Sequence, residues 1–227
     1  MTSIRPPHTP SIRAALAFGL AVLSALFVSA PAHAQQGGIN PFACGPIATG
    51  YGPFDYRTIS DEVRHRVEDY HFTPDVETLR KGSSATTPGP DLDYTLRAFP
   101  NSPRALLSMS RLATRSKTER PIGARWPVEC YFERAIRFLP GDPMPRVLYA
   151  GYLKERKRNA EARAQLDEAD KVRGDPSNFD IDYNMGLMYF DLGVYDKSLE
   201  AAKRAYALGA PLPALQNKLK AAGKWKD

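Results

Sequence analysis

The stretch that decides the fold is YNMGLMYFDLGVYDKSLEAAKRAYALGAP, residues 183–211. Residues three and four apart share one face of a helix. In the first half of the stretch, the positions that share a face are Met185, Gly186 and Tyr189. In the second half they are Ser198, Ala202 and Ala205. The pattern predicts two antiparallel helices that pack closely through small residues.

The same spacing recurs twice upstream. The second-helix triplet is matched first by Ala162, Leu166 and Ala169, and then, at a nearly equal interval, by Val128, Phe132 and Ala135. The first-helix positions of the middle repeat are Tyr149, Ala150 and Leu153. The first helix of the earliest repeat is predicted at 103–113. Breaker clusters around Pro100 and at 139–143, 173–176 and 209–211 separate the predicted helices.

This spacing resembles the tetratricopeptide repeat, W-x2-L-G-x2-Y followed by A-x3-F-x2-A and a late proline, with a period of about 34 residues. The resemblance covers 103–211 and departs from the signature at Asp182, where the signature has Trp. It implies a short right-handed solenoid of helical hairpins whose first helices line a concave groove. The amphipathic segment 212–222 is predicted to cap the last repeat. The predicted fold class is therefore all-α.

The segment 1–34 has the organisation of a secretory signal peptide. Arg5 and Arg13 precede an uncharged apolar core at 14–30, and Ala32-His33-Ala34 forms an A-x-A cleavage site. We expect an exported protein, periplasmic if the source is a Gram-negative bacterium. A retained anchor is the alternative, but the apolar core is at the short end of the lengths that span a membrane.

The charge pattern argues against a nucleic-acid partner. The formal net charge is +6, and it becomes +4 when the two arginines of the signal segment are removed. Basic residues are interspersed with acids, as in KERKRNAEAR at 154–163, which is typical of a solvated helix. No second apolar run is long enough to span a bilayer, so we expect no membrane span after cleavage.

Export makes Cys44 and Cys130, the two cysteines of the chain, candidates for a disulfide. They are far apart in the sequence, and a bridge over such a length stabilises by about 4 kcal/mol on the chain-entropy model. Two free thiols are the alternative. A bridge would attach an irregular N-terminal arm, 35–90, to the outer side of the repeat domain, 91–227. Short helices are predicted in the arm at 60–69 and 74–81, and a helix leading into the first repeat is predicted at 91–99.

The predicted groove takes side chains from the first helices, opposite their contact with the second helices. These residues are Met109, Leu112, Val147, Lys154, Tyr183, Asn184, Leu187, Phe190 and Asp191. The resemblance implies that the groove binds another envelope or exported protein, as a helix or an extended peptide. Tyr183 and Phe190 would be aromatic anchors. Packing between repeats or against the arm is the alternative role for each side chain.

Two other functions stay open. A basic insertion at 114–126 could bind a small ligand or an anionic envelope polymer; its cations are Arg115, Lys117, Arg120 and Arg125. An enzyme would need chemistry in the arm, where the crowded residues are His65, Asp69, His71 and Asp75. Zinc needs three or four converging ligands, and histidines six apart do not share a helix face. No familiar catalytic motif occurs, so we expect no enzyme, cofactor or metal.

Overall fold

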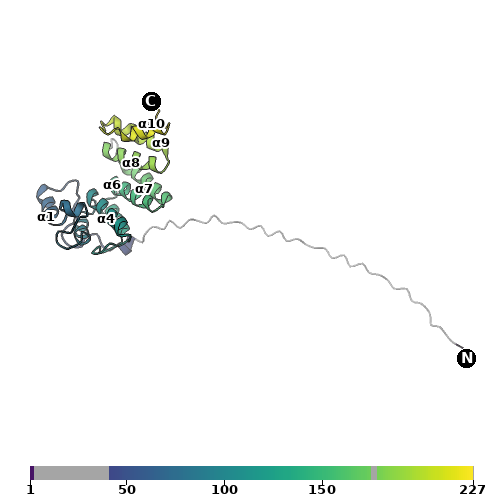
Figure 1. The fold of residues 1–227 in the computed structure, drawn as a ribbon, viewed down its shortest axis with the longest axis horizontal. Coiled ribbons are helices and arrows are strands. Elements are labelled where there is room, and N and C mark those ends of the chain that lie inside the picture. The colour runs from purple at the N-terminus through teal and green to yellow at the C-terminus, as the bar shows by residue number, and fades with distance from the viewer. Residues whose placement is uncertain (3–40, 175–177, 227) are drawn as a thin grey trace. The chain divides into compact units, whose positions relative to one another are not determined.

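The computed structural model describes residues 1–2, 41–174 and 178–226, so the expected signal peptide lies outside the described residues. Within these ranges the chain has ten α-helices, one 3-10 helix and no strand (Figure 1). The prediction of an all-α chain with adjacent helices packed in pairs is confirmed. From residue 41 onward the described residues belong to one compact unit.

The N-terminal part of this unit is built from short helices. They are η1 Pro41–Cys44, α1 Asp61–His71, α2 Pro74–Glu77 and α3 Gly89–Ala98. Helix α1 begins where the Ser60 side chain accepts a hydrogen bond from the Val63 amide at 3.3 Å. The helix predicted at 74–81 ends earlier, at Glu77, which corrects the prediction. Leu79 is in the left-handed conformation (φ 61°) and the Arg80 amide donates back to the Asp75 carbonyl, which closes a turn.

The rest of the unit follows the predicted succession of helices. These are α4 Pro103–Ser116, α5 Val128–Phe138, α6 Pro143–Glu155, α7 Asn159–Val172, α8 Phe179–Asp191, α9 Tyr195–Ala207 and α10 Ala214–Ala221. Ser102 and Asp142 cap α4 and α6, and each is followed by a proline at the first helical position. Proline fits there because that amide has no partner inside the helix.

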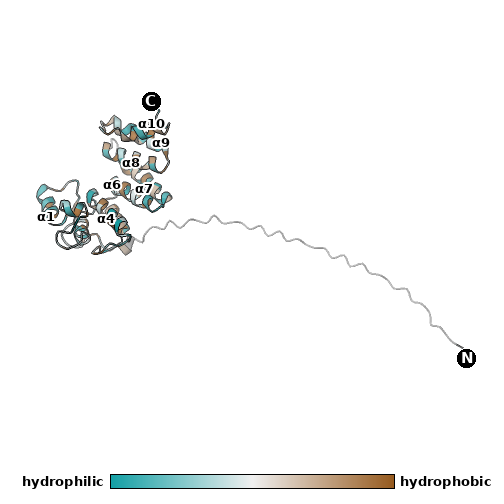
Figure 2. Ribbon diagram, in the orientation of Figure 1, coloured by the Kyte–Doolittle hydropathy of each residue, from teal (hydrophilic) through white to brown (hydrophobic). Residues whose placement is uncertain are grey.

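The repeated triplets form the contacts between paired helices. All nine of their side chains are 0% exposed: Val128, Phe132, Ala135, Ala162, Leu166, Ala169, Ser198, Ala202 and Ala205. In the last pair the Ser198 hydroxyl donates to the Gly186 carbonyl at 2.8 Å. Because Gly186 has no Cβ, Leu215 of α10 can also pack closely against this position. Burial therefore confirms the predicted contact positions of the triplets in α5, α7 and α9. Figure 2 shows that hydrophobic and hydrophilic residues both occur along the described helices.

The first helices of successive pairs also contact one another. Helix α6 packs against α4 and α8, and α10 packs against α8 and α9. Leu215 and Leu219 of α10 are fully buried against the α8–α9 pair. The predicted terminal helix therefore covers an apolar surface at the C-terminal end of the described chain.

The segment before residue 90 shares the core of the helical pairs. Phe72 and Val76 belong to the same buried cluster as Leu96 and Met109. Helix α1 packs on α3, and α3 packs on α4. Helix α3 begins at Gly89 and so runs across the boundary expected at residue 90. The arm is thus folded onto the helical pairs through a common core.

A clasp holds residues 44–47 against α5. Cys44 and Cys130 form a disulfide, as predicted. Beside it the fully buried guanidinium of Arg134 donates to the carbonyls of Cys44 (3.1 Å), Pro46 and Ile47 (3.0 Å), and lies 4.0 Å from the Trp126 ring centroid. Burial lowers the pKa of Arg134 to about 10. The guanidinium therefore stays charged at neutral pH, with carbonyl oxygens as its hydrogen-bond acceptors.

Candidate functional site

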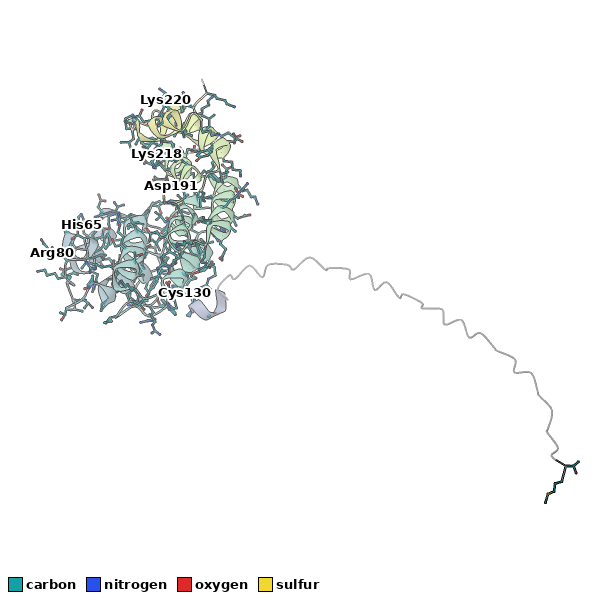
Figure 3. The ribbon with its side chains drawn as sticks, turned by 45° about the vertical axis from the view of Figure 1, so that its right-hand side comes forward. His65, Arg80, Cys130, Asp191, Lys218 and Lys220 are labelled. Atoms are coloured by element: carbon teal, nitrogen blue, oxygen red, sulfur yellow. A yellow bond between two sulfur atoms is a disulfide. The ribbon has the colours of Figure 1, made fainter. Side chains whose placement is uncertain are left out.

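The candidate site is the surface shared by the first helices α4, α6 and α8, with α10 at its end. Three polar contacts link these helices. The Thr114 hydroxyl donates to Glu155 at 3.1 Å, and Asp191 accepts from Lys154 at 3.1 Å and from Lys218 at 3.0 Å. These contacts connect α4 to α6, α6 to α8 and α8 to α10, and we call the surface that carries their side chains the first-helix face. Figure 3 labels Asp191 and Lys218 of this group.

Charge on the first-helix face is concentrated around Asp191. Burial raises the pKa of this carboxyl, but hydrogen bonds from Lys218 and Lys154 outweigh burial and lower it. Two cations therefore surround one anion, and the group carries a net positive charge at neutral pH. All three side chains are about one-third to one-half exposed, and such pairs contribute little to stability. The lysines can exchange Asp191 for an acidic group of a partner at small cost.

Apolar surface lies directly beside this charge group. Leu187 and Phe190 are half-buried and pack against the cluster that contains Leu215 of α10. The Phe190 ring has its centroid 5.4 Å from that of Tyr195 and 5.1 Å from the Lys218 ammonium. Helix α10 thus covers part of the groove that the sequence predicted to be open. The uncovered part of Leu187 and Phe190 is an apolar strip with lysines beside it.

The structure corrects the positions of four predicted groove residues. The four are buried, and they are Met109, Leu112, Val147 and Tyr183. They belong to the packed core and cannot reach a partner in this structure. Tyr183 packs edge-on against Tyr206 of α9. The exposed Asn184 remains at the surface, but its amide donates to the Asp180 carbonyl at 2.7 Å within the same helix.

The correction in α4 has a simple physical reason, which is the helix register. Thr114 faces α6. Leu107, Arg111 and Thr114 follow one another at spacings of four and three residues, so they share one face of α4. Leu107 is 37% exposed and was not predicted as a site residue. Ser102-Pro103 and Asp142-Pro143 start successive first helices in the same way, and superposing them aligns Leu112 with the buried Tyr152. The caps give no such signal for Leu107, which aligns with the buried Val147.

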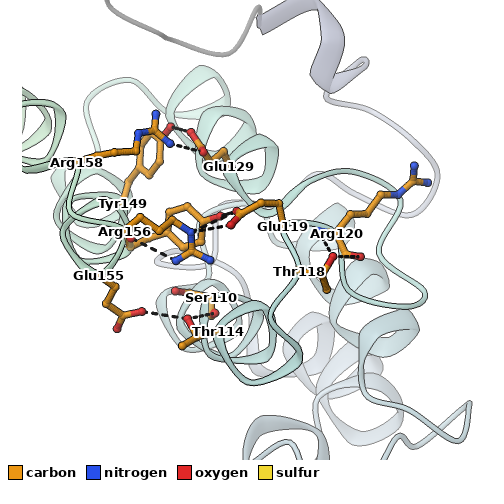
Figure 4. A network of polar contacts seen from close by, with 11 residues as sticks. Ser110, Thr114, Thr118, Glu119, Arg120, Glu129, Tyr149, Glu155, Arg156 and Arg158 are labelled. Atoms are coloured by element: carbon orange, nitrogen blue, oxygen red, sulfur yellow. Dashed lines mark hydrogen bonds and ion pairs between the residues drawn. The ribbon is translucent and has the colours of Figure 1, made fainter.

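The basic insertion is held against the protein by its own polar groups (Figure 4). Glu119 accepts hydrogen bonds from Arg156 at 3.1 Å and from the Tyr152 hydroxyl. Arg120 donates to the Ala124 carbonyl at 3.1 Å, and the Arg125 amide donates to Asp93 at 3.1 Å. The segment is therefore a folded connection between α4 and α5.

A hollow of about 290 Å³ lies beside this connection. It is lined by Ala113, Thr114, Lys117, Thr118, Glu119, Glu155 and Arg156. The lining carries two acids and two bases, so its charges balance. The exposed Arg115 and Lys117 remain at the surface. A hollow of mixed sign favours polar peptide groups over an anionic polymer.

The histidines of the arm have separate partners. His65 pairs with Asp69 at 3.3 Å, and His71 lies 3.0 Å from Asp91. Asp75 pairs with Arg80 instead, so the four residues considered as a metal site do not converge. Within the described ranges no group of three or more His, Cys, Asp or Glu could hold a metal ion.

Asp91 holds the loop before α3 in the same region. Its fully buried carboxylate accepts hydrogen bonds from the Ser83 amide at 2.8 Å and from the Ser84 amide at 3.1 Å. Burial raises the pKa of this carboxyl, but the Ser84 and His71 hydrogen bonds outweigh it and lower the pKa. Asp91 therefore anchors the loop before α3, and its contact with His71 connects it to α1.

No protein-family profile matches this chain, and no curated protein matches it at a significant level of similarity. Among the described helices, none has the length and apolar character that a membrane span needs. The functional argument therefore rests on the first-helix face itself.

Proposed function

We propose that this protein is an exported interaction scaffold of the tetratricopeptide type, whose first-helix face binds a helix or extended peptide of another envelope protein. The proposal joins the signal-peptide pattern of residues 1–34 with the repeated helical pairs. Its binding surface runs from Leu107 on α4 to Phe190 on α8. The tetratricopeptide assignment rests on the spacing of the repeated triplets.

One observation carries the proposal. Helix α8 presents a half-buried apolar strip, Leu187 and Phe190, next to a lysine–aspartate–lysine group that links α6, α8 and α10. Half-buried aromatic and aliphatic side chains supply contact area, and exchangeable charges supply orientation. A peptide with apolar residues at helical spacing and an acidic residue beside them fits this surface.

Site-directed photocrosslinking from the intact exported protein tests the proposal. A photoreactive residue placed at Leu187 is expected to capture one protein, which mass spectrometry then identifies. The purified partner should lose at least tenfold in affinity with Phe190→Asp, because the substitution places a charge in the contact. Circular dichroism must show that the variant keeps its helices.

The chain offers a closely matched control pair for the same experiment. Leu107 and Leu208 are both leucines, 37% and 39% exposed, but only Leu107 is on the first-helix face. Leu107→Asp is expected to weaken partner binding several-fold, whereas Leu208→Asp should leave it unchanged. Equal effects of the two substitutions, or capture of the same protein from position 203 on α9, would refute the proposed face.

A further inference from the structure

The segment that precedes Asp227 has a one-sided charge pattern, and apart from Lys218 its cations are not part of the first-helix face. From Lys203 to Lys226 the sequence contains six basic residues and no Asp or Glu. Two of these cations are already paired: Arg204 with Asp182 at 2.8 Å and Lys218 with Asp191 at 3.0 Å. The others are exposed.

The exposed lysines lie beside aromatic rings. The Lys220 ammonium is 5.9 Å from the Trp225 ring centroid, and the Lys224 ammonium is 5.2 Å from that of Tyr195. Both lysines are exposed, so their ammonium groups stay accessible from solvent while their aliphatic stems lie along the protein. Figure 3 shows Lys220 on the terminal helix, at the end of the described helices.

An exposed apolar side chain adjoins these lysines. Trp225 packs edge-on against Tyr206, with centroids 6.0 Å apart, and the Tyr206 hydroxyl donates to the Leu212 carbonyl at 2.8 Å. Leu212 is 51% exposed. These contacts connect Lys220, Trp225 and Leu212 through Tyr206, and the exposed Lys224 and Lys226 flank Trp225 in the sequence. We call the set the lysine face: Leu212, Lys220, Lys224, Trp225 and Lys226.

We propose that the lysine face binds the anionic headgroups of a phospholipid bilayer. Clustered lysines are attracted to the negative potential of such a surface. The half-buried Trp225 and the exposed Leu212 supply apolar side chains that can enter the headgroup region. Asp196 shares a hollow with Lys224, but Arg163 lines the same hollow, so the positive charge of this end is retained. Binding of this kind needs no spanning helix and leaves the first-helix face free.

Vesicle flotation tests the assignment with the full mature chain. The protein should float with vesicles that contain 30–40% phosphatidylglycerol, a composition on the order of common anionic membranes, and not with pure phosphatidylcholine vesicles. Raising the salt from 0.1 to 1 M shortens the Debye length from about 10 to about 3 Å and should release it. Equal flotation with both vesicle types would overturn the proposal.

A pair of double variants locates the surface. Each lysine near an anionic bilayer raises the partition coefficient about fivefold, so Lys220→Glu with Lys224→Glu should lower it at least 25-fold. Arg115→Glu with Lys117→Glu makes the same change of net charge at exposed positions at the end of α4, and should have a much smaller effect. Equal losses would mean that only net charge matters and would overturn the lysine face.

Fluorescence and a soluble polyanion separate the remaining outcomes. The chain has two tryptophans, and Trp126 packs against Arg134. A blue shift on vesicle binding that Trp225→Phe removes supports insertion at the lysine face. Binding to polyglutamate without any flotation would instead assign the face to an acidic macromolecule and refute the lipid proposal. None of these outcomes bears on partner crosslinking at Leu187.

Discussion

The helical pairs α6–α7 and α8–α9 and the region from η1 to α5 are held together in different ways. The pairs pack through small and apolar side chains that recur at fixed spacing, such as Ala162, Leu166 and Ala169. The N-terminal region depends on contacts between residues far apart in sequence. The Cys44–Cys130 disulfide and the hydrogen bonds of Arg134 to residues 44–47 both join α5 to a distant part of the chain.

This difference indicates which contacts can be removed without unfolding the whole chain. Local helix pairs regain their contacts as soon as neighbouring turns form, whereas long-range links must first overcome the entropy of closing a large loop. The pairs should therefore tolerate damage to the clasp. The clasp should not survive damage to α5, because both of its anchors, Cys130 and Arg134, are on that helix.

Removal of the disulfide should have the largest effect and would sharpen the comparison most. Cys44→Ser with Cys130→Ser is expected to lower the free energy of unfolding by about 4 kcal/mol, because the unfolded chain regains the entropy of a large loop. Chemical denaturation measures the loss. Hydrogen exchange should show reduced protection of α5, with α8 and α9 little changed. Uniform loss of protection in both regions would break the comparison.

Replacement of Arg134 should have the next largest effect. Arg134→Leu leaves the carbonyls of Cys44, Pro46 and Ile47 without their donor, and we expect a loss of about 3 kcal/mol. Arg137 is the matched control, because it is half-buried and donates to one carbonyl, that of Gly45, at 3.0 Å. Arg137→Leu should cost about 1 kcal/mol. Equal losses for the two variants, measured by urea denaturation, would contradict a special role for the buried guanidinium.

The same difference explains what could be predicted from the sequence. Triplets such as Ser198, Ala202 and Ala205 repeat at helical spacing, so both the helices and their packed faces were predictable. Helix α1 begins directly after Ser60, close to the start of the helix predicted at 60–69. The disulfide was inferred from the count of cysteines together with the signal pattern. These features are local or have a single possible pairing.

The rest depends on contacts that leave no local pattern. Nothing around Arg134 indicates that it will donate to carbonyls of residues 44–47, since an arginine in a helix is usually solvated. The short α2 ends because Leu79 adopts a left-handed conformation, which Leu rarely does. The burial of Leu112 depends on the α4 register, and the cap at Ser102 specified that register only by analogy with Asp142.

A substitution that overpacks the α8–α9 pair tests the helical pairs, and we expect a smaller loss in the free energy of unfolding than for the clasp variants. A Cβ at residue 186 would lie 2.5 Å from the Leu215 Cδ2 and 3.4 Å from the Ser198 carbonyl. Gly186→Val should therefore displace α10 and cost about 2 kcal/mol. Gly141→Val is the control, since a Cβ there meets nothing within 4 Å. Thermal unfolding compares them, and loss of protection should be confined to α8, α9 and α10. Damage that spreads to α1 and α3 would show that the two regions unfold together.

The smallest expected effect concerns Asp191, whose pKa is lowered by Lys218 and Lys154 against the opposing effect of burial. A lowered carboxyl pKa contributes stability that is present above the unfolded value, about 3.9, and is lost as pH falls through the folded value. Asp191→Asn should thus cost up to about 1 kcal/mol at pH 7, where the carboxylate is charged, and nearly nothing at pH 2. The measurement is the difference in free energy of unfolding between the two proteins at each pH. A difference that persists at pH 2 would show that Asp191 stabilises the α6–α8–α10 contact through packing, as the small-residue triplets do, and not through its charge.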